Sequence, residues 1–165
     1  LEEIFEKGEK AVIFTSFKKM IDMLCNDIKQ RYGVYVNYID GSVPAKERQL
    51  TIDEFGTVVG AGALVLNPKA AGAGLNITCA NHAIHYNLEW NPAVEDQASA
   101  RVFRRGQEKT VFVHRLYYVD TIEEIINEKI QNKRILSDNA IIGNTGSTTD
   151  QEYLIKALSA SPYKH

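Results

Sequence analysis

The chain contains 165 residues, of which 44% are hydrophobic, and its 19 basic and 21 acidic side chains give a formal net charge of −2. This length and composition predict one globular domain with a sizeable core and are too apolar for a disordered chain. No apolar run approaches the roughly 18 to 20 residues that span a bilayer, and no signal-peptide pattern opens the chain, so we expect no membrane partner. The charge argues against a strongly basic nucleic-acid-binding domain, so any anion site must be local.

Cysteine and histidine usage gives no sign of a metal site. Cys25 and Cys79 lie far apart, without a CxxC motif or a neighbouring pair of histidines. A disulfide framework or a zinc site is therefore not expected, and a reducing compartment fits this usage. His82 and His85 lie three residues apart around a short predicted strand, so their side chains should point to opposite faces of the sheet and should not share a metal ion.

Short apolar runs alternate with longer amphipathic segments along most of the chain. Gly33 is placed to end the first long helix, Asn91-Pro92 to begin the third, and Thr121-x-x-Glu124 has the form of a capping box. Strands that alternate with helices indicate βαβ units and an α/β fold with a mostly parallel sheet covered on both faces. The predicted strands are residues 11–14, 34–39, 63–66, 83–86 and 111–116, and the predicted helices are residues 16–32, 44–55, 91–104 and 121–137.

The segment from Gln97 to Gln107 is rich in arginine. Offsets of four and seven would place Gln97, Arg101 and Arg104 on one stripe of the predicted helix. Two guanidinium groups on one face can bind a phosphate in a bidentate manner that lysine cannot match. The alternative is a solvated arginine face, and the spacing alone does not decide between the two.

A stretch of small residues follows the predicted strand at 63–66. Gly72 and Gly74 would let backbone N–H groups approach a ligand closely, and Asn76 can both donate and accept hydrogen bonds. A tight turn after a buried strand is the structural alternative. A dinucleotide-binding loop is weakly supported, because Ile77 stands where a third glycine is needed and no acidic residue is well placed about 20 residues further on.

These segments together resemble the motifs of Swi/Snf-type ATPases of helicase superfamily two. Asp96-Gln-Ala-x-x-Arg101-x-x-Arg104-x-Gly106-Gln107 resembles motif VI, and the stretch from Lys69 to Thr78 resembles motif V. Further similarity covers Lys10 to Phe17 (motif IV), Asp40-Gly-Ser42 with Arg48 and Phe55, and the link from His85 to Glu95. The motifs occur in the family's order over about residues 10 to 136.

The resemblance implies a RecA-like three-layer sandwich with a C-terminal helical extension. By this resemblance Arg101 and Arg104 are arginine fingers that reach the γ-phosphate of ATP, and Gly72, Gly74, Asn76 and Gln97 also contribute to ATP binding. Thr15, Ser16 and Lys69 are candidates for contacts to the backbone of double-stranded DNA, with hydroxyl, amide and ammonium donors suited to phosphates. Arg105 stands where the family usually has an apolar residue, and no catalytic role is assigned to it.

The sequence contains no G-x-x-x-x-G-K-[ST] phosphate loop and no Asp-Glu pair at the end of a buried strand. We therefore expect ATP and Mg²⁺ to be held mainly by an N-terminal RecA-like lobe of a longer polypeptide, and this chain alone to hydrolyse no ATP. The expected divisions are 1–9 (end of an inter-lobe helix), 10–120 (RecA-like lobe), 121–142 (brace helix) and 143–165 (linker and short terminal helix).

The leading hypothesis is thus the second motor lobe of an ATP-dependent translocase on double-stranded DNA, with a nucleoprotein complex as a further possible partner. A nucleic-acid or protein docking module that has lost ATP coupling remains the alternative. The expected location is the bacterial cytoplasm, in association with the nucleoid, or the nucleus if the protein is eukaryotic.

Overall fold

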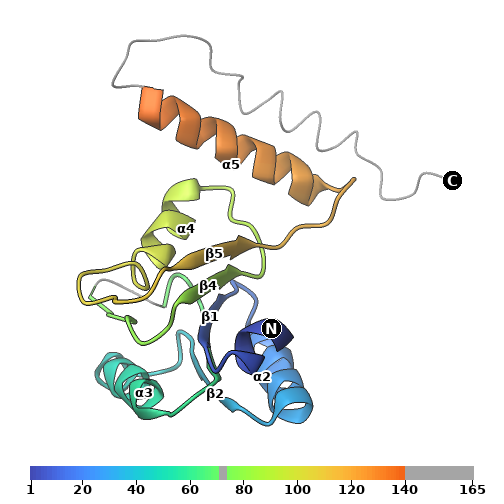
Figure 1. The fold of residues 1–165 in the computed structure, drawn as a ribbon. Helices are drawn as coiled ribbons and strands as arrows, with labels where there is room; N and C mark the ends of the chain where they lie inside the picture. The colour runs from blue at the N-terminus through green and yellow to red at the C-terminus, as the bar shows by residue number, and fades with distance from the viewer. Residues whose placement is uncertain (71–73, 140–165) are drawn as a thin grey trace, which may run out of the picture.

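The computed structural model describes residues 1–70 and 74–139, and within them a single parallel sheet organises the molecule (Figure 1). Its strand order is β2-β3-β1-β4-β5, and every neighbouring pair is parallel. The strands are β1 (Lys10–Phe14), β2 (Tyr35–Ile39), β3 (Gly62–Leu66), β4 (His82–His85) and β5 (Phe112–Arg115). The helices are α1 (Glu2–Glu6), α2 (Lys18–Tyr32), α3 (Ala45–Thr57), α4 (Pro92–Ser99) and α5 (Ile122–Asn139).

Helices cover both faces of the sheet, which confirms the predicted three-layer α/β sandwich (Figure 1). Side chains of β1 alternate between the two layers, as the period of a strand requires. Val12 and Phe14 pack with α3, α4 and the segment between β3 and β4, whereas Ala11 and Ile13 pack with α1 and α2. All five residues of β1 are buried. A strand that is covered on both faces needs apolar side chains on both, which is why the sequence of β1 after Lys10 is continuously apolar.

Lys10 is the one charged residue of β1, and its ammonium group serves the end of α3. The group donates to the carbonyl oxygens of Phe55 at 2.7 Å and Gly56 at 3.1 Å, and it lies 5.1 Å from the centre of the Phe55 ring. The last carbonyls of a helix lack partners within the helix, and a cation is favourable there. Burial lowers the pKa of Lys10 from its ordinary value. Lys10 therefore joins the central strand to the end of a covering helix.

Two predicted helix boundaries are confirmed. The main chain of Gly33 takes φ 62° and ends α2 in the left-handed conformation, with its N–H donating to the carbonyl of Lys29. Asn91 precedes α4 and its side chain accepts a hydrogen bond from the Ala93 N–H, with Pro92 at the first helical position. The strand boundaries differ from the predicted ones by at most one residue.

Helix α5 lies beside the sandwich rather than on a face of the sheet (Figure 1). Ile126 and Ile130 pack on Leu88 in a small apolar cluster separate from the two main ones. Lys129 places its ammonium group 5.1 Å from the centre of the Trp90 ring, which is 41% exposed. The predicted linker and terminal helix at 143–165 lie outside the described residues. No helix in the described part of the chain is long and apolar enough to cross a membrane.

We predict that Gly33→Ala lowers the free energy of unfolding by about 1 kcal/mol, because alanine disfavours the left-handed conformation. An added Cβ at Gly33 would meet nothing within 4 Å, so backbone strain is the only penalty. Gly41→Ala is the matched control, since its added Cβ also meets nothing within 4 Å and Gly41 lacks a positive φ. Urea denaturation of both variants measures the difference, and equal stabilities would contradict the assignment.

Candidate functional site

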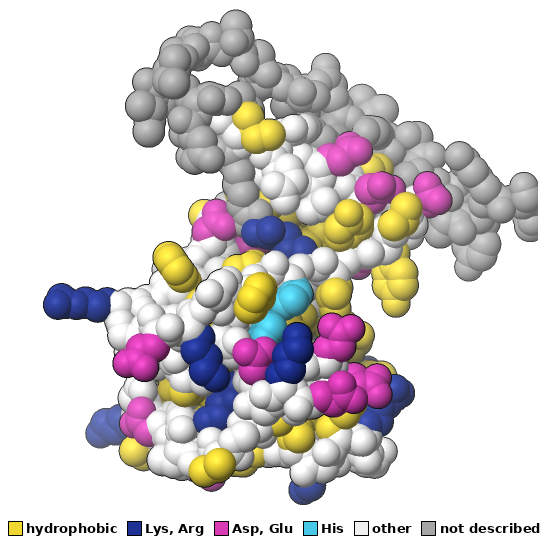
Figure 2. Space-filling model, in the orientation of Figure 1, with side chains coloured by type: hydrophobic (Ala, Val, Ile, Leu, Met, Phe, Trp, Pro, Cys, Tyr) yellow, Lys and Arg dark blue, Asp and Glu magenta, His cyan; other side chains and the backbone are white. Residues whose placement is uncertain are grey.

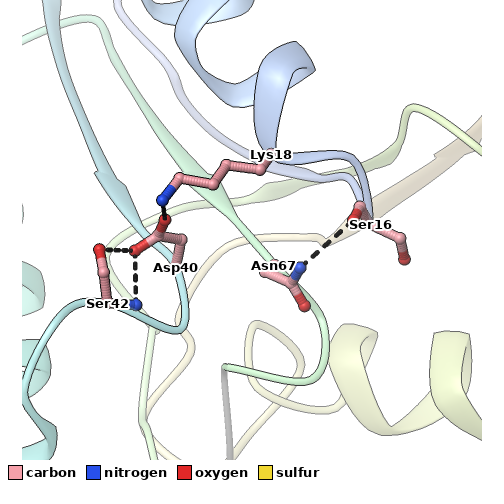
Figure 3. Close-up of polar contacts among 5 residues, drawn as sticks. All are labelled: Ser16, Lys18, Asp40, Ser42 and Asn67. Atoms are coloured by element: carbon pink, nitrogen blue, oxygen red, sulfur yellow. Dashed lines mark hydrogen bonds and ion pairs between the residues drawn. The ribbon is translucent and has the colours of Figure 1, made fainter.

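Loops from three strands meet at the carboxyl edge of the sheet. The side-chain oxygen of Asn87, after β4, accepts from the Thr15 hydroxyl at 2.8 Å and from the Ser16 N–H at 3.1 Å, after β1. Asn67, after β3, donates its amide to the Ser16 carbonyl at 3.4 Å (Figure 3) and accepts from the Lys69 N–H at 3.0 Å. Strand ends of a parallel sheet converge in this way at ligand-binding edges.

The three predicted DNA-contacting residues differ in accessibility. Lys69 is exposed and Ser16 is half-buried, so both present polar groups near this edge. Thr15 is 0% exposed and its hydroxyl is engaged by Asn87. Thr15 therefore offers no donor at the surface here, and its side chain instead fixes the turn that carries Ser16. Sequence reasoning gave Asn87 no role and missed this anchoring contact.

Asp40, after β2, forms a second polar cluster beside the first (Figure 3). Its carboxylate accepts from the Ser42 N–H at 2.9 Å and from the Ser42 hydroxyl, and it lies 3.7 Å from the Lys18 ammonium group. The Ser42 hydrogen bonds, followed by the charge of Lys18, hold the pKa of the buried Asp40 carboxyl below its ordinary value. The ion pair of Asp40 with Lys18 on α2 was not predicted from the sequence.

The arginine-rich segment departs from the predicted helix. Helix α4 ends at Ser99, so the expected helix to Arg104, with Gln97, Arg101 and Arg104 on one stripe, is wrong. Residues 100–107, which we call the arginine turn, instead follow with tight hydrogen bonds such as Arg101 N–H to Ala98 O at 3.1 Å. Gly106 takes φ 100° there. Beyond the end of α4, the Arg101 carbonyl accepts from the Ile77 N–H at 2.9 Å.

Two segments that are distant in the sequence therefore form one unit. Besides the Ile77–Arg101 backbone bond, the Arg104 guanidinium donates to the Leu75 carbonyl at 3.3 Å. Val102 of the arginine turn is buried with Leu75 and Ile77 in the same apolar cluster. The motif V segment (residues 69–78) and the arginine turn thus share backbone and core contacts.

Other side chains hold the two ends of this unit. Arg48 on α3 donates to the carbonyls of Val43 at 2.8 Å and Ala70 at 2.7 Å, which anchors the start of the motif V segment. Gln107 donates its amide to the Ala80 carbonyl at 2.7 Å, and His85 lies 2.8 Å from the Ser99 hydroxyl at the end of α4. The arginine turn is therefore held directly by the segment between β3 and β4, while α3 and β4 hold the neighbouring Ala70 and the end of α4.

The predicted ATP-binding residues are mostly accessible. Gln97, Asn76, Gly74 and Arg104 are exposed, whereas Arg101 is half-buried. Gly74 takes φ 108°, a conformation that requires glycine there. Gly72 lies outside the described residues. In the part of the chain that the structure describes, neither Arg101 nor Arg104 forms an ion pair, so both guanidinium groups retain donors suited to a phosphate.

Sequence reasoning missed a buried carboxylate on α4. The Glu95 side chain is 0% exposed, and it accepts from the Arg115 guanidinium at 2.9 Å and from the Glu89 N–H at 3.2 Å. Glu89 in turn accepts a hydrogen bond from the Ser16 hydroxyl. Helical spacing is the signal that could have identified Glu95. It lies three residues before Ala98, which faces the core, and residues three apart lie on the same face of a helix.

The histidines face opposite sides of the sheet, as predicted. His85 stacks on Phe14 and contacts Ser99, whereas His82 contacts Glu9 at 2.8 Å and His114 at 3.0 Å. The hydrogen bond from His82 lowers the pKa of Glu9. Among the described residues no group of three or more His, Cys, Asp or Glu side chains is arranged to hold a metal ion.

Charge does not gather into one field on the face seen in Figure 2, where Lys and Arg side chains are interspersed with Asp and Glu. This pattern agrees with the net charge of −2. Long-range attraction of a polyanion by this chain alone is therefore weak, and an anion must be bound by local donors. The exposed or half-buried donors at the carboxyl edge and in the arginine turn are such groups.

Comparison with known proteins identifies the domain. Residues 1–106 match the model of the helicase conserved C-terminal domain. The chain is 39% identical over 135 residues to the putative ATP-dependent helicase/translocase YwqA of Bacillus subtilis, covering 82% of this chain and 14% of that protein. It is 33% identical over 150 residues to helicase SWR1 of Saccharomyces cerevisiae, covering 91% of this chain and 10% of that protein.

Two solved structures share the fold. The C-terminal part of the Fun30 ATPase domain has a TM-score of 0.75 at 30% identity, covering 95% of this chain and 49% of that one. The Sulfolobus solfataricus SWI2/SNF2 ATPase core in complex with double-stranded DNA has a TM-score of 0.65 at 38% identity, covering 82% and 28%.

The parallel sheet and these matches define a RecA-like helicase C-terminal lobe. More particularly, the chain belongs to the Swi/Snf family of ATP-dependent helicase-like proteins. It spans only 10% and 14% of the length of the two relatives described above.

We predict that the stability of the domain depends on the ionisation of Asp40. Because its folded-state pKa lies below the ordinary value of 3.8, the stability it contributes is present above pH 3.8 and is lost as the pH falls through the lower folded-state pKa. Asp40→Asn should lower the free energy of unfolding at neutral pH by about 2 kcal/mol and flatten its decline in acid. Ser42→Ala should flatten it partly, since the backbone hydrogen bond remains. Denaturant titrations between neutral and acidic pH test this, and a wild-type slope in Asp40→Asn would refute it.

Proposed function

We propose that the chain is the second motor lobe of an ATP-dependent translocase on double-stranded DNA. In this proposal Arg101 and Arg104 act as arginine fingers at an ATP site that an N-terminal RecA-like lobe completes. The observation that carries it is the junction of the arginine turn with the motif V segment, in which both arginines keep guanidinium donors without an ion-pair partner in the described residues.

The arrangement suits phosphoryl transfer for a physical reason. A fixed guanidinium group stabilises the negative charge that develops on the transferred phosphoryl group, and positioning costs nothing at the moment of reaction when the donor is held beforehand. The Arg104 guanidinium is held by the Leu75 carbonyl, and the Arg101 backbone, which carries the second guanidinium, is bonded to Ile77. Gly74, Asn76 and Gln97 are exposed and are proposed to contribute to ATP binding, as is Gly72. Mg²⁺ is assigned to the N-terminal lobe.

DNA binding is proposed for the carboxyl edge of the sheet. Ser16 and Lys69 offer a hydroxyl and an ammonium group from neighbouring strand ends, and Thr15 holds the Ser16 turn through Asn87. The donors of this edge fit phosphate oxygens, which position a protein on a duplex without reading its sequence. A structural relative of this chain is the ATPase core solved with double-stranded DNA.

A translocase of this kind works on chromosomal DNA, so we place it at the bacterial nucleoid or in the nucleus, where it could act on a nucleoprotein complex. Helix α5 is proposed to act as a brace, because it packs on Leu88 in the loop between β4 and α4. This loop connects the carboxyl edge of the sheet to the helix that precedes the arginine turn. The alternative, a docking module without ATP coupling, would leave the accessible arginine pair without a purpose.

We predict that Arg101→Ala and Arg104→Ala, in the full-length protein with both lobes, each lower DNA-stimulated ATP hydrolysis by about 10³-fold or more, because a charge-stabilising donor is lost. Steady-state ATPase assays with and without double-stranded DNA measure this.

Arg105→Ala is the matched control, since Arg105 is an exposed neighbour in the same turn, and it should keep most of the activity. The isolated 165-residue chain should hydrolyse no ATP. Undiminished rates in Arg101→Ala and Arg104→Ala would return both residues to a solvated face and favour the docking module.

We predict that Lys69→Ala weakens DNA binding and lowers the slope of log K against log salt concentration by about 0.9, because one phosphate contact is lost. Fluorescence anisotropy at several salt concentrations measures the slope. Lys29→Ala is the control, because Lys29 is exposed near the end of α2, away from the carboxyl edge. Equal slopes in the two variants would argue against binding at this edge.

A further inference from the structure

A continuous set of hydrogen bonds runs from the carboxyl edge of the sheet to α4. The Ser16 hydroxyl donates to the Glu89 carboxylate, and the Glu89 N–H donates to Glu95 at 3.2 Å. The second oxygen of Glu95 accepts from Arg115, at the end of β5, at 2.9 Å. Four segments, the β1 loop, the β4 loop, α4 and β5, are therefore connected by one polar network, which we call the Glu95 network.

The central carboxylate is costly to bury. The Glu95 side chain is 0% exposed, and its partner Arg115 is 23% exposed. The free-energy cost of removing such a pair from water commonly offsets most of the attraction between the charges. An apolar residue at this position could therefore stabilise the fold to the same extent. What the carboxylate provides is geometry, because its two oxygens fix two donors from different segments at the same time.

The position of Glu95 on α4 gives this geometry a functional meaning. Helix α4 ends at Ser99, directly before the arginine turn that carries Arg101 and Arg104. The other end of the network is Ser16, at the edge where DNA binding is proposed. The network therefore spans the two regions that a DNA-stimulated ATPase must couple.

We propose that Glu95 is a positioning residue that couples the state of the Ser16 turn to the placement of the arginine turn. The inference rests on the proposed function. The Ser16 hydroxyl donates its hydrogen bond to the Glu89 carboxylate, and a duplex phosphate that binds at Ser16 competes for this bond. A resulting displacement of Glu89 is passed to the Glu95 carboxylate through the hydrogen bond from the Glu89 N–H. Glu95 touches neither DNA nor ATP in this scheme and acts only through α4.

The substitution Glu95→Gln tests the scheme with little change of shape. A glutamine side chain offers one carbonyl oxygen, which cannot serve both the Glu89 N–H and the Arg115 guanidinium as the two carboxylate oxygens do. In the full-length protein at saturating DNA, we expect the ratio of DNA-stimulated to DNA-free kcat to fall by about tenfold, with KM for ATP little changed. Saturation removes any effect on DNA affinity from the ratio.

A double-mutant cycle with Ser16→Ala tests the connection itself. If both residues act through one network, the ratio in the double variant should resemble that of the more impaired single variant, rather than the product of two independent losses. Ile28→Val is the control for a general loss of stability, because Ile28 is buried between α2 and the opposite face of the sheet. It should lower the melting temperature and leave the ratio unchanged.

The outcomes separate the two proposals. Three results in a DNA-stimulated wild type would overturn the coupling role and leave the motor function standing. The first is a wild-type ratio of DNA-stimulated to DNA-free kcat in Glu95→Gln. The others are independent, multiplying effects of the Ser16 and Glu95 substitutions, or an equal fall of the ratio in Ile28→Val. If the wild-type ATPase is not stimulated by DNA, the proposed function fails and the coupling role fails with it.

Discussion

The architecture depends on β1, a strand buried on both faces and paired on both edges. Its neighbours β3 and β4 are parallel to it, so the chain must cross over a face of the sheet between successive strands. This constraint brings the loops after β1, β3 and β4 to one edge. It also sends the motif V segment back across the face that α3 and α4 cover, where it meets the arginine turn. Both candidate regions thus follow from one sheet topology.

The sequence predicted the fold well because the local signals agree with the tertiary packing. The apolar run of β1, the glycine that ends α2 and the Asn-Pro start of α4 each specify a local structure that the fold retains. The prediction was wrong where a tertiary contact overrides periodicity. Arginine is a good helix former, and nothing before Arg101 signals a stop. The Arg101 carbonyl instead bonds to Ile77, a partner 24 residues earlier in the sequence that spacing cannot reveal.

The candidate site was predicted in part, for similar reasons. Motif spacing identified the arginine turn and the motif V segment, but it could not show that Thr15 is buried and Ser16 accessible, since adjacent residues differ only in the direction of their side chains. Glu95 escaped notice because a single glutamate on a polar helix looks solvated. Its burial depends on the pairing with Arg115, which lies on β5 and not on α4. Long-range polar pairs leave no periodic trace in a sequence.

The contrast among the arginines connects structure with function. Arg48 has two of its donors engaged by backbone carbonyls, and the charge of Arg115 is paired with a buried carboxylate. Arg101 and Arg104 are oriented by backbone contacts but have no carboxylate partner in the described ranges. A guanidinium group that is fixed in position yet not neutralised loses little entropy when it binds an anion and retains its full charge for it. The Arg104 guanidinium meets this condition through the Leu75 carbonyl, and Arg101 lies in the same turn, whose backbone is bonded to Ile77.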